Sequence, residues 1–61
     1  MKLSEFKAKI MPGLYHYDHY EASNGAFIQA RACGTSYIYQ DEHGNRQEFY
    51  TFEALKQAVE V

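Results

Sequence analysis

The sequence predicts a small α+β domain: a four-stranded antiparallel sheet built from two consecutive hairpins, with a short helix at each end of the chain. Three observations support this fold class. Aromatic-rich runs flank the turn 41–45, alternating runs flank the turn 23–25, and residues 52–60 carry apolar side chains at helical spacing. We therefore expect the order α-β-β-β-β-α in a single domain spanning residues 1–61.

The first predicted helix covers residues 3–11. Leu3, Phe6 and Ile10 recur at i, i+3 and i+7, which would place them on one face of a helix. Pro12 ends the segment, because proline disfavours helical geometry in the residue before it. We expect this apolar stripe to lie against the sheet.

The first predicted hairpin joins strands 14–20 and 26–33. Asn24-Gly25 is a typical two-residue hairpin turn. That turn would pair Tyr20 with Gln29, Asp18 with Arg31, and His16 with Cys33. The opposite charges of Asp18 and Arg31 would favour this register.

The second predicted hairpin joins strands 36–40 and 46–50. A type I turn followed by Gly44 in the left-handed conformation would give a three-residue loop. That loop would pair Tyr37 with Phe49, Tyr39 with Gln47, and Ile38 with Glu48. Both faces of this hairpin are apolar, so the pattern leaves open which face the helices cover.

The second helix is predicted at residues 52–60. Thr51 is a suitable N-cap, and Glu53 places a negative charge in the first turn. The apolar residues Phe52, Leu55, Ala58 and Val59 lie at i, i+3, i+6 and i+7. This spacing is typical of an amphipathic helix that packs on a sheet.

Charge and cysteine content exclude several classes of protein. Eight acidic and six basic residues give a formal charge of −2, and acidic residues surround the strand bases Arg31 and Arg46, so nucleic acid is not an expected partner. Cys33 stands alone, which favours a reducing compartment. The segment 1–7 lacks the apolar run of a signal peptide, and the chain lacks a run of about 18 apolar residues. These features predict a cytoplasmic protein with no membrane association.

The side chains with reactive or metal-binding chemistry do not form a recognisable site. His16, Asp18, His19 and Cys33 are suitable zinc ligands by type, but a strand would direct His16 and Asp18 to one face and His19 to the other. Cys33 with His16 as its base would lack an oxyanion element and an orienting residue. We therefore predict no metal site, no cofactor, no catalytic residue and no enzymatic activity.

The aromatic residues are the most informative set. Six Tyr and four Phe exceed what one face of a thin sheet can bury under two short helices. The predicted interaction surface consists of Tyr15, Tyr17, Tyr37, Tyr39 and Phe49. The alternative is that these rings only wrap the edge of a thin core.

These features together predict a small, non-catalytic, intracellular protein-binding module that acts through an exposed aromatic sheet face. The size class is that of accessory proteins of phages and other mobile elements, which act by occupying a host protein. Two alternatives stay open: single-stranded nucleic-acid binding by aromatic stacking, and a self-associating structural domain. A homodimer would bury the surplus rings and enlarge the core.

Overall fold

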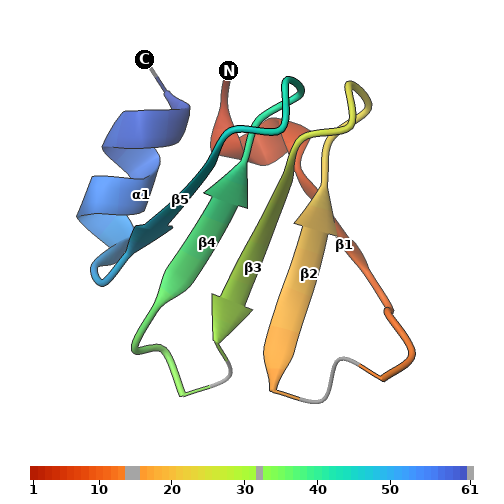
Figure 1. Cartoon of the computed structure of the whole chain (residues 1–61), viewed down its shortest axis with the longest axis vertical. Helices are drawn as coiled ribbons and strands as arrows, with labels where there is room; N and C mark the ends of the chain where they lie inside the picture. The colour runs from red at the N-terminus through yellow and green to blue at the C-terminus, as the bar shows by residue number, and fades with distance from the viewer. Residues whose placement is uncertain (14–15, 32, 61) are drawn as a thin grey trace.

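The computed structural model describes residues 1–13, 16–31 and 33–60. Figure 1 shows an antiparallel sheet whose five strands lie in chain order, with one α-helix at the β5 side of the sheet. The elements are η1 (Leu3–Glu5), β1 (Lys7–Lys9), β2 (Tyr17–Glu21), β3 (Phe27–Arg31), β4 (Tyr37–Gln40), β5 (Arg46–Phe49) and α1 (Phe52–Val59). The predicted α+β class and antiparallel sheet are confirmed, whereas the prediction of four strands and two α-helices is wrong in its counts.

The N-terminal segment is the first correction. In place of a helix over residues 3–11, a 3-10 turn at Leu3–Glu5 leads into strand β1 at Lys7–Lys9. Leu3 and Phe6 do pack against the core, because a 3-10 turn also brings residues i and i+3 to one side. The third member of the stripe, Ile10, is 93% exposed.

Pairing with β2 explains why this segment is extended. A helix of about nine residues is marginal on its own, whereas β1 satisfies the outward backbone groups of β2 and covers an otherwise open edge. Lys7 lies directly opposite Glu21, and Lys9 Nζ lies 3.4 Å from Glu21 Oε2. Pairing with β2 therefore determines the structure of this segment, despite the helical spacing of its apolar residues.

The second hairpin has the predicted register. Tyr37 pairs with Phe49, Tyr39 with Gln47, and Ile38 with Glu48. The turn is closed by the N–H of Asp41, which donates to the carbonyl of Asn45 at 3.0 Å. Gly44 has φ +90°, as the left-handed position of this loop requires.

The first hairpin differs from its prediction by one residue. Tyr20 pairs with Ile28 and Asp18 with Ala30, because the loop contains three residues, and the N–H of Ala22 donates to the carbonyl of Ala26 at 2.9 Å. A two-residue type I′ turn would need positive φ at Asn24 as well as at the glycine, and among the described residues only glycines have positive φ.

This shift changes which side chains share a face, because a slip of one residue exchanges the two faces of a strand. The helix-side face carries Ala8, Asp18, Tyr20, Ile28, Ala30, Tyr37, Tyr39, Gln47 and Phe49. The open face carries Lys7, Lys9, Tyr17, His19, Glu21, Phe27, Gln29, Arg31, Ile38, Gln40, Arg46 and Glu48.

Helix α1 packs on the helix-side face. Thr51 caps it as predicted, since its side chain accepts a hydrogen bond from the N–H of Ala54 at 3.1 Å. Leu55 and Val59 are buried together with Ile28 of β3. Within the described residues, no helix has the length and apolar character needed to cross a membrane.

Candidate interaction surfaces

The residues of the predicted interaction surface are divided between different surroundings. Tyr37, Tyr39 and Phe49 lie on the helix-side face, half-buried, and pack against the core. Tyr17 lies on the open face. Tyr15 lies outside the described residues. The structure therefore brings three of the five residues together, on the face that the helix partly covers.

Two segments cover this face: the N-terminal segment and helix α1. Each contacts the sheet through an edge-to-face ring pair. Phe6 contacts Tyr39 with ring centroids 6.2 Å apart, and Phe52 of α1 contacts Tyr37 at the same distance. The N–H of Leu3 also donates to Glu60 Oε2 at 2.8 Å, so the N-terminal segment is tied to the end of α1. Desolvation raises the pKa of the Tyr39 hydroxyl, and the nearby carboxylates of Asp41 and Glu42 raise it further.

An apolar groove remains between these two coverings. Its volume is about 400 Å³. The N-terminal segment forms one wall, α1 forms the other, and strands β2, β3 and β4 form the floor. The lining residues are Leu3, Phe6, Tyr20, Ile28, Ala30, Tyr37, Phe52 and Leu55. We call this surface the apolar groove.

The strands direct little charge to the groove side. Asp18 lies directly opposite the groove residue Ala30 and is exposed. It is the single charged side chain that the described strands direct to the helix-side face, and the basic strand residues all point to the open face. One end of the groove floor is therefore weakly negative.

The open face contains a buried histidine. His19 is 5% exposed, and its Nε2 lies 3.0 Å from Glu21 Oε1 while Gln29 Nε2 lies 3.2 Å from its Nδ1. A proton on Nε2 satisfies both contacts. The hydrogen bond from His19 lowers the pKa of the Glu21 carboxyl group, and Lys9 lowers it further.

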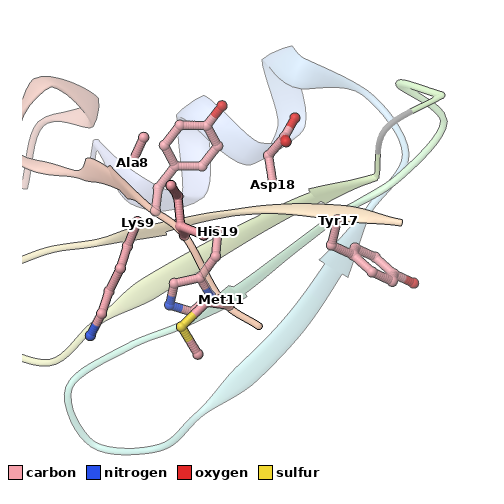
Figure 2. A pocket seen from close by; sticks show the side chains of 8 residues that line it. Ala8, Lys9, Met11, Tyr17, Asp18 and His19 are labelled. Atoms are coloured by element: carbon pink, nitrogen blue, oxygen red, sulfur yellow. The ribbon is translucent and has the colours of Figure 1, made fainter. Parts of the chain in front are cut away.

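A second hollow of about 330 Å³ lies where β1 ends and β2 begins. Figure 2 shows Lys9, Met11 and His19 on one side of β2, with Asp18 on the other. The polar groups of this hollow consequently do not converge on one point, as a general acid and base or a set of metal ligands must.

His16 and Cys33, which the predicted register placed opposite each other, lie beyond the paired residues of β2 and β3, and both are exposed. Cys33 Sγ lies 3.0 Å from Thr35 Oγ1. This hydrogen bond lowers the pKa of the thiol. Among the described residues no three His, Cys, Asp or Glu side chains form a group that could hold a metal ion.

Of the eight groove residues, the predicted interaction surface contained only Tyr37, so sequence reasoning missed the other seven. Leu3, Phe6 and Phe52 each belong to an apolar stripe that the sequence assigned to the interior of a helix–sheet contact. The signal that could have found Phe52 is its position directly after the N-cap, where a side chain projects from the end of the helix. It is 50% exposed.

Comparison of the chain with known protein families, curated proteins and solved structures found no match.

Proposed function

We propose that this protein is a non-catalytic protein-binding module that receives an amphipathic helix of a partner protein in its apolar groove. The observation that carries the proposal is the groove itself, an aromatic and aliphatic surface left between two coverings of the same sheet face. Grooves of this kind bind helices through apolar residues spaced at i, i+3, i+4 and i+7.

The backbone arrangement favours a helix over an extended peptide. The groove floor belongs to β2, β3 and β4, whose backbone groups are paired on both sides. An occupant must therefore satisfy its own N–H and C=O groups, which an α-helix does internally. A helix seated beside α1 would extend the helical layer over the sheet, as two-layer α+β packing requires.

The charge beside the groove floor indicates which charge the partner helix should carry. Asp18 lies beside the floor residue Ala30, and no described basic strand residue faces this side. An apolar helix with Lys or Arg along the flank nearest Asp18 would be complementary to this surface. An acidic flank would place like charges together.

A titration with a designed peptide tests the proposal. The fluorescence anisotropy of a labelled amphipathic peptide of Leu and Lys should rise when the protein is added. The same peptide with Glu in place of Lys should bind more weakly. Phe52→Glu, which puts a charge into the groove wall, should weaken binding at least tenfold.

The matched control is Tyr50→Ala. Tyr50 is two residues from Phe52, is 70% exposed, and donates its hydroxyl to Glu48 of the open face at 3.1 Å. This variant should bind the peptide as the native protein does. Equal loss in both variants, or no binding at high micromolar concentration, would overturn the proposal.

Self-association is a further outcome of the same work. Light scattering after size-exclusion chromatography gives the mass of the free protein. A stable dimer that Phe52→Glu converts to monomer would mean that the occupant of the groove is a second copy of this chain, and would contradict a separate partner helix.

A further inference from the structure

The positive charges of the strands lie on the open face of the sheet. All four basic residues of the strands point to it: Lys7, Lys9, Arg31 and Arg46. The register predicted from the sequence placed Asp18 opposite Arg31, whereas the observed register directs Asp18 to the helix-side face. The uncovered face of an acidic protein is consequently basic.

The two acidic residues of this face are already engaged. Glu21 contacts Lys9 Nζ at 3.4 Å and His19 Nε2 at 3.0 Å. Glu48 accepts a hydrogen bond from the hydroxyl of Tyr50, which raises the pKa of that hydroxyl. Among the described residues, no carboxylate lies within ion-pair distance of the remaining bases, which are Lys7, Arg31 and Arg46.

Aromatic rings lie between these bases. A row of paired residues crosses the sheet with Phe27 at its centre and bases at both ends: Lys7, Glu21, Phe27, Gln40 and Arg46. Adjacent strands are about 4.8 Å apart, so each terminal base is about 10 Å from Phe27.

A second ring lies farther along the same strands. The guanidinium carbon of Arg31 lies 5.8 Å from the ring centroid of Tyr17, and both residues belong to one cross-strand pair. Phe27 is four residues from Arg31 on β3, which corresponds to about 13 Å. The open face therefore offers two rings: Tyr17, with Arg31 beside it, and Phe27, which packs against the His19 ring with centroids 5.2 Å apart.

We infer that the open face binds single-stranded nucleic acid, with bases of the strand stacking on Tyr17 and Phe27 and its phosphates contacting Lys7, Arg31 and Arg46. Sheets that bind single strands combine aromatic side chains with positive charge in this way. This inference concerns the face opposite the apolar groove and is independent of the proposed helix-binding function.

Fluorescence anisotropy with labelled single-stranded DNA and RNA of about ten nucleotides tests the inference. Binding should weaken with salt, with a slope of log K against log [salt] near about −2 for three phosphate contacts. Tyr17→Ala should weaken binding at least about fivefold, and Tyr17→Phe should retain it because the ring remains.

Two variants that each remove one positive charge distinguish a specific binding site from non-specific electrostatic attraction. Arg31→Ala and Lys56→Ala change the net charge equally, but Lys56 lies on α1. Arg31→Ala should weaken binding and make the salt slope shallower by about 0.7, whereas Lys56→Ala should have no effect. Absence of binding at low salt, or equal effects of these two variants, would overturn the inference.

The two proposals fail separately. Phe52→Glu should abolish peptide binding in the groove and leave oligonucleotide binding within about twofold of native, where the added charge acts only at a distance. Oligonucleotide binding that Phe52→Glu abolishes would contradict the assignment to the open face, even if the groove binds its peptide as expected.

Discussion

Tyr20 of β2 lies directly opposite Ile28 of β3 on the helix-side face. This pair belongs to the floor of the apolar groove, and it exists because the first hairpin turns through a three-residue loop. With the two-residue turn, Tyr20 would face Gln29, and Tyr20 and Ile28 would lie on opposite faces of the sheet.

The two strand isoleucines should therefore respond differently to truncation. Ile28→Val should lower the free energy of unfolding by about 1 kcal/mol, because Ile28 is 4% exposed and packs against Leu55 and Val59. Ile38→Val, on the open face, should cost less than half as much because Ile38 is only half-buried. Urea unfolding measures both, and equal costs would contradict the assignment of the faces.

The two hairpin glycines should be equally sensitive to substitution. Gly25 and Gly44 have φ of +95° and +90°, with open space where a Cβ would lie. Gly25→Ala and Gly44→Ala should each cost about 1–2 kcal/mol through backbone strain alone. A neutral effect of Gly25→Ala in denaturant unfolding would contradict the positive φ of Gly25.

How much of this fold could be predicted depended on how many local signals agreed. The second hairpin was predictable because Gly44 and the pairing of Tyr37 with Phe49 point to one register. The first hairpin was not, because Asn24-Gly25 fits a two-residue turn by type, and the choice is made by burial of Tyr20 against Ile28.

The N-terminal strand and the groove depend on contacts between distant parts of the chain. Leu3 and Phe6 have the same apolar spacing in a helix and in a 3-10 turn, and only the edge of β2 decides that residues 7–9 are extended. The groove unites Leu3 with Leu55, residues whose proximity no local pattern encodes. Local pattern therefore predicted the aromatic content of this face but not the position of its opening.

Glu21 should make stability depend on pH in the acid range. Its pKa in the folded state is lowered, first by the hydrogen bond from His19. A lowered pKa stabilises the folded state above the unfolded value of about 4.3, and this contribution is lost as pH falls through the folded value.

Urea unfolding between about pH 6 and about pH 3, a range that spans the ordinary Glu pKa of about 4.3, measures this effect. Glu21→Gln should flatten the decline in stability relative to the native protein. Glu48→Gln removes a carboxylate from the same face without touching His19 and serves as the control. A decline that Glu21→Gln leaves unchanged would refute the role of this network.

The exposed thiol should depend on its threonine neighbour. The hydrogen bond with Thr35 lowers the pKa of Cys33, which raises the thiolate fraction near neutral pH. Thr35→Val should therefore slow alkylation by iodoacetamide, whereas Thr35→Ser should preserve the native rate. Identical rates in all three proteins would show that the hydrogen bond does not control this thiol.

A map of amide chemical-shift changes on addition of the Leu and Lys peptide shows directly whether the apolar groove binds a helix. The largest changes should fall on the groove residues Phe6, Ile28 and Leu55, and Phe52→Glu should remove them. Changes centred instead on Phe27 and Ile38 of the open face would contradict binding in the groove.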